Sequence, residues 1–369
     1  MIHSTLAPSS ASRRMQCPGS RAMTELFPQA QDNPRALEGV IAHKVNEAVL
    51  NNLPLPDGHT EEMLDGADLW KATIEKIISR SKSIDMSFEK RMDIFSIHQS
   101  CFGTPDFDAY DSDNHCLDVV DYKFGHRHVS EYENWQLIEY AVGAIDKYGP
   151  AFVKSGKRTN DLIVNLTIVQ PRSYHKDGPV RTWTIDGTVM NEYFKRLRES
   201  ELRSLEADAP VITGPECRDC SARHACSNLQ QAAAIEVEMS VVNAPFDMSA
   251  NAQGKELSTL RRAIAILEAR ASGLEDEVLT KVKQGHPVVG WRTEQSQGRK
   301  KWNKPIEEVL ALGGMMGVNL EKPTAITPTQ AIKAGLSAEI VSQYSETPVG
   351  EIKLVPDDLG RARNVFNKE

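Results

Sequence analysis

The stretch of sequence that decides the fold reads GTPDFDAYDSDNHCLDVVDYK and spans residues 103–123. One β-hairpin's worth of sequence lies between Asp106 at its first end and the Asp121-x-Lys123 motif at its second. Alternate residues of a strand point to the same face, so we expect Asp121 and Lys123 to lie side by side there. An exposed strand can show the same alternation by chance. This stretch alone therefore leaves a functional and a purely structural interpretation open.

The size and charge of the chain limit the classes of protein it can be. A length of 369 residues exceeds what one hydrophobic core usually supports, so we expect one large domain with an appendage. The hydrophobic fraction of 40% and the charged fraction of 25% are those of an ordinary soluble globular protein. Because the net charge is -8, any nucleic-acid role requires a local basic patch rather than a global positive field.

The sequence also predicts a cellular compartment. No run of apolar residues approaches the length of a membrane span, and no apolar segment follows Arg13 and Arg14 near the N-terminus. We therefore expect a cytoplasmic protein with no membrane partner. In that reducing compartment, the six cysteines favour metal binding over disulfides.

Residue patterning predicts a mixture of helices and strands. Helices are expected at 37–50, 61–82, 130–148, 187–208 and 254–284, strands at 161–170 and 180–186, and an extended stretch at 84–101. This mixture predicts an α/β fold with a mixed sheet. The chain divides into a domain over 1–230, a linker over 231–253 and a mainly helical C-terminal extension over 254–369, which we expect to bind DNA or to oligomerise.

Two of the expected helices carry polar residues on one face. His43 and Glu47 lie four residues apart on the first, and Gln136 and Tyr140 lie four apart on the third. Either pair could also belong to an ordinary solvated helix face.

The cysteines after residue 210 form a compact group. Cys217 and Cys220 are separated by two residues, and Cys226 follows shortly after. Short loops of this kind let several sulfurs converge on one metal centre. Zinc stays open as the metal, because His224 or Cys17 could complete a tetrahedral site. Taken by itself, Cys17 is more typical of a buried thiol than of a metal ligand, and we expect Cys101 and Cys116 to be core residues.

A basic segment near the C-terminus combines positive charge with aromatic rings. Its candidate nucleic-acid contacts are Trp291, Arg292, Arg299, Lys300, Lys301 and Trp302. Basic groups interleaved with aromatic faces suit phosphate contact and base stacking. A solvated hairpin with its tryptophans packed inward is the alternative.

Four short motifs, in this order, resemble the RecB-like branch of the PD-(D/E)xK nuclease superfamily. They are Gly39-x-x-x-His43, Gly103-x-x-Asp106, Asp121-x-Lys123 and Gln136-x-x-x-Tyr140. The cysteines strengthen the resemblance. In the AddB subunit and the CRISPR-associated RecB-like nucleases, one cysteine before the nuclease core and three after it bind a 4Fe-4S cluster. The nuclease resemblance covers residues 5–230, and the N-terminal region also resembles a phage and prophage family described as uncharacterised or exonuclease-like.

The resemblance implies a restriction-endonuclease-like core and a role for each motif. His43, Asp106 and Asp121, with the Tyr122 carbonyl, would bind one or two Mg2+ or Mn2+ ions. Lys123 would orient or deprotonate a water molecule and help stabilise the transition state. Gln136 and Tyr140 would hold the nucleic-acid strand or brace the site, and Glu47 would support His43. The resemblance further implies a structural 4Fe-4S cluster on Cys17, Cys217, Cys220 and Cys226.

The expected function is that of a metal-dependent exonuclease acting on linear DNA in phage recombination or replication. The alternatives are a nucleic-acid-binding module that no longer cuts and a zinc-stapled structural or interaction protein. By analogy, the partners besides DNA would be a phage single-strand annealing protein and other copies of the chain in a homo-oligomer.

Overall fold

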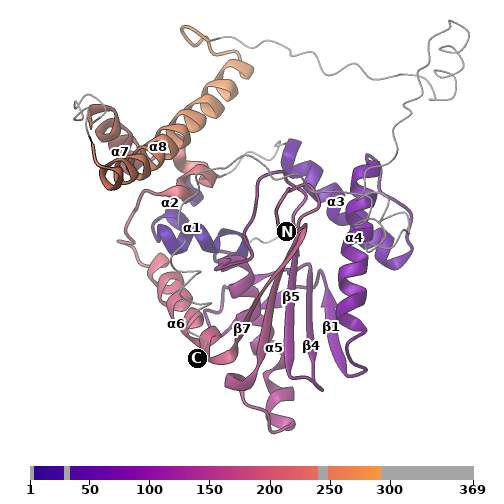
Figure 1. The fold of residues 1–369 in the computed structure, drawn as a ribbon. Coiled ribbons are helices and arrows are strands. Elements are labelled where there is room, and N and C mark those ends of the chain that lie inside the picture. Colours follow the sequence, from indigo (N-terminus) through magenta and orange to yellow (C-terminus); the bar gives the residue numbers. More distant parts are fainter. Residues whose placement is uncertain (1–3, 29–33, 240–247, 292–369) are drawn as a thin grey trace, which may run out of the picture. The chain divides into compact units, whose positions relative to one another are not determined.

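The computed structural model describes residues 4–28, 34–239 and 248–291 (Figure 1). The chain divides into two compact units, residues 1–293 and 294–369, and all described residues belong to the first. Among the described residues, no helix is long and apolar enough to cross a membrane.

A five-stranded mixed sheet forms the centre of the first unit. Its strands are ordered β1 (Ile84–Phe88), β4 (Phe107–Asp111), β5 (Cys116–Tyr122), β6 (Ile163–Val169) and β7 (Val180–Asp186). Neighbouring strands are antiparallel except for β5 and β6, which are parallel. The predicted hairpin is confirmed, since β4 pairs with β5 from Phe107 opposite Val120 to Asp111 opposite Cys116. The predicted mixed α/β fold is confirmed as well.

Helices cover both faces of this sheet, so β4 and β5 are buried along their whole lengths. Helices α3 (Pro34–Asn51) and α4 (Glu61–Ile78) pack their apolar side chains with Phe107, Val120 and Tyr122. Helices α5 (Trp135–Lys154) and α6 (Gly187–Ser204) pack with Leu117 and Val119, on the opposite face (Figure 1). The strict alternation of β5 thus sends neighbouring residues into two different cores. Cys101 and Cys116 are buried, as expected of core residues.

Helix α5 is the crossover that joins the parallel strands β5 and β6. The sequence predicted its start near residue 130, but the helix begins at Trp135. Glu133 has a φ of 50°, which a helix does not accommodate. Asn134 then caps the helix, and its side chain accepts hydrogen bonds from the backbone N–H groups of Gln136 and Leu137.

Short elements flank this core. They are η1 (Pro8–Ser10), α1 (Ala11–Gln16), α2 (Ser20–Leu26), β2 (Met92–Asp93), β3 (Phe102–Gly103), η2 (Thr159–Asp161), η3 (Pro215–Asp219) and η4 (Ser221–His224). They are followed by α7 (Ser227–Met239) and the long helix α8 (Ala250–Lys283). The predicted linker over 231–253 is therefore helical at both ends. Leu229 and Ala233 of α7 are buried against Ile266 and Ala269 of α8, which gives this alanine-rich stretch a reason to fold.

Candidate metal and catalytic site

The end of strand β5 brings an acid and an ammonium group together. Lys123 Nζ lies 2.8 Å from Asp121 Oδ2, which confirms the expected side-by-side placement. Within the described residues, this buried carboxylate oxygen has no further polar partner besides the Lys123 ammonium group. The backbone N–H of Lys123 donates to the carbonyl of Val169 at 2.9 Å, and this bond extends the parallel pairing of β5 and β6 one residue beyond the strand.

Gln136 joins the acid to the ammonium group from the first turn of α5. Its Nε2 donates to Asp121 Oδ1 at 2.9 Å, and its Oε1 accepts from Lys123 Nζ at 3.0 Å. The side-chain amide of Gln136 therefore makes one hydrogen bond to the negative carboxylate of Asp121 and one to the positive ammonium group of Lys123. This geometry favours bracing the site over contacting a nucleic-acid strand.

Three further side chains converge beside this pair. The ligand atoms of His43, Glu89 and Asp106 all lie within 4.8 Å of one another. His43 Nδ1 is 3.3 Å from Asp106 Oδ1 and 3.7 Å from Glu89 Oε1. Imidazole nitrogen and carboxylate oxygens together suit Mn2+, and carboxylate oxygens suit Mg2+. The residues present therefore fit a divalent cation.

The chain around Asp106 is fixed by backbone and aromatic contacts. Asp106 Oδ2 accepts a hydrogen bond of 2.6 Å from the backbone N–H of Tyr122. The buried Tyr122 ring packs edge-on against His43, with ring centroids 5.6 Å apart. Tyr140 is also buried, and its hydroxyl donates to the carbonyl of Thr104 at 3.1 Å. Both tyrosines thus hold the site's framework.

Glu89 is the site residue that the sequence analysis missed. It follows β1 with a φ of 42°, and its N–H donates to the Asp106 carbonyl at 3.2 Å, so the turn holds its carboxylate near His43. One acidic residue in the charged run of residues 89–91 carries no pattern that marks it. The sequence instead favoured Glu47, which is exposed.

The charges in this site shift one another's pKa values. Burial alone would lower the pKa of His43, but Asp106 and Glu89 raise it to about 10. Burial opposes ionisation of Asp106, yet the adjacent His43 lowers the pKa of its carboxyl. Burial raises the pKa of Asp121, and repulsion from Asp106 adds to this effect. Burial would lower the pKa of Lys123, but the nearby Asp121 raises it, so Lys123 is an ammonium donor in this arrangement.

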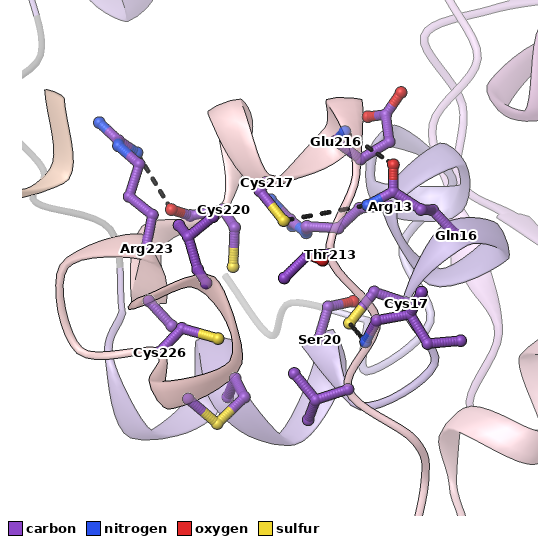
Figure 2. A pocket seen from close by; sticks show the side chains of 15 residues that line it. Arg13, Gln16, Cys17, Ser20, Thr213, Glu216, Cys217, Cys220, Arg223 and Cys226 are labelled. Carbon is purple, nitrogen blue, oxygen red and sulfur yellow. Dashed lines mark hydrogen bonds between the residues drawn. The ribbon is translucent and has the colours of Figure 1, made fainter. Parts of the chain in front are cut away.

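The four cysteines Cys17, Cys217, Cys220 and Cys226 line one cavity (Figure 2). The backbone N–H of Ile212 donates to Cys17 Sγ at 3.3 Å, and that of Gly214 donates to Cys217 Sγ at 3.4 Å. Burial raises the pKa of both of these thiols, and these N–H groups partly oppose that effect. A tetrahedral zinc ion with bonds of about 2.3 Å would hold its sulfurs about 3.8 Å apart. Within the described chain, no three of these sulfurs lie within 4.8 Å of one another.

The predicted C-terminal contacts fall mostly beyond the described part of the chain. Trp291 is 62% exposed and pairs with Val288 in an isolated β-bridge. The remaining predicted contacts, Arg292, Arg299, Lys300, Lys301 and Trp302, lie outside the described residues.

The fold and the site define a mixed α/β protein with a candidate divalent-metal site at the end of its central hairpin. The chain belongs to the family described as "Protein of unknown function (DUF2800)", whose model matches residues 3–362. It is also similar to the solved structure titled "Crystal Structure of LHK-Exo in complex with dAMP", with 13% sequence identity and a TM-score of 0.20, over 53% of this chain and 90% of that one. So low a TM-score carries no conclusion about activity, which has to be inferred from this chain's own residues.

Proposed function

We propose that this protein is a metal-dependent nuclease that hydrolyses phosphodiester bonds of DNA. The observation that carries the proposal is the convergence of His43, Glu89 and Asp106 next to the Asp121–Lys123 pair. These residues come from α3, two loops and the end of β5, and only the fold brings them together. The order of the sequence motifs, which resembles that of RecB-like nucleases, supports the same assignment.

The residues divide the chemical work between them. A bound Mg2+ or Mn2+ would lower the pKa of water and offset charge on the phosphate. His43, Glu89 and Asp106 would hold the ion, with Asp121 adding Oδ2, the oxygen that faces the Lys123 ammonium group. Lys123 is placed to orient the attacking water and to stabilise negative charge on the phosphate. Gln136 keeps Lys123 and Asp121 at the required separation.

The surface of α3 leaves room for a substrate beside these ligands. Gly39 lies one helical turn before His43, and a Cβ atom added there would meet no atom of the described residues within 4 Å. A nucleic-acid backbone could therefore approach His43 along this side of the helix.

The test is degradation of end-labelled linear DNA with Mg2+ or Mn2+, compared between wild type and Lys123→Ala. We expect metal-dependent cleavage that the variant loses, and a parallel digest of circular DNA separates exonuclease from endonuclease activity. Cleavage by Lys123→Ala at the wild-type rate would refute the proposed role of Lys123. DNA binding without cleavage across several metals would favour the non-cutting module instead.

The cysteine cavity is proposed to hold a 4Fe-4S cluster with a structural role. The support is that four cysteines line one cavity and that backbone N–H groups donate to two of their sulfurs. The cluster would join Cys17 to a segment about 200 residues later. The chain entropy lost on closing so long a loop is only slightly greater than for a shorter loop, because it grows with the logarithm of the length.

The cluster proposal is tested on anaerobically purified protein by metal analysis and absorbance. Cys220→Ser should lose iron, the brown absorbance and thermal stability, whereas Cys116→Ala, outside the cavity, should keep its iron. Zinc without iron in the wild type would contradict the cluster. Loss of the absorbance with unchanged stability would contradict its structural role.

A further inference from the structure

A second polar cavity lies beside the N-terminal segment of the chain. Its volume is about 260 Å3, and it is lined by residues 4–25 alone, from η1, α1, α2 and the segment before them. Its lining is rich in hydroxyl groups and guanidinium groups, among them Ser4, Ser10, Arg13, Ser20, Arg21 and Thr24. No aromatic ring is among the described lining residues, so the cavity offers hydrogen-bond donors and positive charge rather than a stacking surface.

The positive charge in this cavity is only partly neutralised. Arg13 donates to Ser10 Oγ at 2.9 Å and to the Asp219 carbonyl at 2.5 Å. Within the described chain it forms no ion pair, although burial raises the pKa of the nearby Glu216 carboxyl and the charge of Arg13 partly opposes that effect. Arg21 pairs with the exposed carboxylate of Glu25 at 2.7 Å. Because an ion pair with an exposed carboxylate is weak, both guanidinium groups remain available to an anion.

A buried hydroxyl in the cavity wall lacks a partner. Ser20 is 2% exposed, and its Oγ makes no hydrogen bond in the described structure. Buried hydroxyls nearly always have a partner, so the Ser20 hydroxyl is free to donate to a ligand in the cavity. Ser20 and Arg13 also border the cysteine cavity (Figure 2).

The segment that lines the cavity packs against the stretch of chain that leads into Asp106. Ser4 Oγ donates to the Ser100 carbonyl at 2.8 Å and accepts from the Phe102 N–H at 3.2 Å. A Cβ atom at Gly103 would lie 2.8 Å from Pro8, so this segment packs tightly against the chain three residues before Asp106.

We infer that this cavity binds a phosphate group of a DNA strand whose scissile bond lies at the candidate metal site. The inference rests on the proposed nuclease function and adds a subsite to it. Guanidinium groups and hydroxyls match phosphate oxygens, and contacts to phosphate alone position a strand without reading its sequence. The subsite thus predicts cleavage that is insensitive to base identity at that position.

The experiment measures binding of a single-stranded oligonucleotide in EDTA, where no cleavage occurs, over a range of salt concentrations. Each phosphate contact contributes about 0.7 to the slope of log K against log salt. We expect Arg13→Gln and Arg21→Gln each to reduce the slope by about that amount. Arg158→Gln removes the same charge from an exposed pair with Asp161 and should leave the slope unchanged. Inorganic phosphate, titrated by calorimetry, should bind the wild type more tightly than Arg13→Gln.

Each outcome decides a separate point. If the salt slopes of Arg13→Gln and Arg21→Gln both equal the slope of Arg158→Gln, the subsite is overturned, even if the wild type cuts DNA. A lowered slope in a protein that never cuts would support the subsite and refute the nuclease. Loss of phosphate binding with an unchanged DNA slope would overturn the strand assignment in favour of a free anion. If Arg13→Gln fails to fold, Arg21→Gln and Thr24→Ala decide the result, since neither residue contacts the cysteine segment through a hydrogen bond.

Discussion

Replacing Gln136 with leucine tests the side chain that hydrogen-bonds to both Asp121 and Lys123 in the candidate site. The amide makes two hydrogen bonds to charged groups, 2.9 Å to Asp121 and 3.0 Å to Lys123. A hydrogen bond to a charged group contributes about 1.5–3 kcal/mol. The 2.8 Å contact between Lys123 and Asp121 survives the change, so part of the arrangement persists. We expect a net loss of about 2–3 kcal/mol in transition-state stabilisation, or roughly 30- to 150-fold in kcat/KM.

The assay is the initial rate of Mg2+-dependent cleavage of end-labelled linear DNA as a function of DNA concentration. Because Gln136 braces the site, the loss should fall on kcat with KM unchanged, whereas a strand-holding role would raise KM. Gln253→Leu, an exposed amide on α8, is the matched control and should behave as wild type. A kcat/KM for Gln136→Leu within threefold of wild type would refute the reasoning.

Three further substitutions test other parts of the structure. Glu89→Gln should weaken Mn2+ binding by about 10- to 100-fold, measured by calorimetry, because it removes a charged ligand or ligand partner. Glu139→Gln should flatten the pH dependence of the free energy of unfolding. Burial, then repulsion from Glu201, raises the pKa of Glu139 from 4.5 to about 8, so it contributes stability below pH 4.5 that is lost as the pH rises through 8. Gly66→Ala should lower the free energy of unfolding by about 1–3 kcal/mol in denaturant titrations, because the added methyl group meets the buried Tyr122 hydroxyl.

Matched controls separate these effects from general damage. Glu47→Gln changes an exposed acid on the same helix as His43 and should leave Mn2+ affinity unchanged. Gly39→Ala adds a methyl group where no atom lies within 4 Å and should stabilise the protein by about 0.5–1 kcal/mol. If Glu47→Gln and Glu89→Gln bind Mn2+ with equal affinity, the assignment of Glu89 to the metal site is contradicted. A wild-type pH profile for Glu139→Gln would contradict the raised pKa, and a Gly66→Ala protein as stable as wild type would contradict the tight packing.

Local pattern was enough to predict much of the fold. The predicted helix over 37–50 corresponds to α3 (Pro34–Asn51), and the predicted strand over 180–186 to β7 (Val180–Asp186). Each of these elements packs at least one face against the core. Its apolar residues therefore recur with the repeat of a helix or of a strand, which the sequence shows directly. The start of α5 was misplaced because Glu133 takes a left-handed conformation that composition does not reveal. The linker assignment overlooked α7, because alanine-rich helices bury few large side chains.

The residues of the candidate site also fall into those that local sequence pattern predicted and those that it did not. Asp121 and Lys123 could be paired from sequence, since side chains two residues apart on a strand share a face. Glu89 could not be found, because a turn residue with a φ of 42° brings it to His43 from a different segment. The sequence favoured Glu47 for its helical spacing, but position on a helix does not say what lies across from it.

The sequence by itself determined which residues share a strand or helix face, because backbone geometry sets those spacings. It thereby placed the acid beside the ammonium group and predicted the cysteine group after residue 210. The resemblance of the motifs further implied that His43 meets Asp106 and that Cys17 joins the later cysteines, and the structure places these residues together. Only the tertiary structure decided that Glu89 joins His43 and Asp106, and that the N-terminal arginines line a cavity. These contacts join segments far apart in the chain, and they depend on the paths of loops and the packing of helices, which no local spacing specifies.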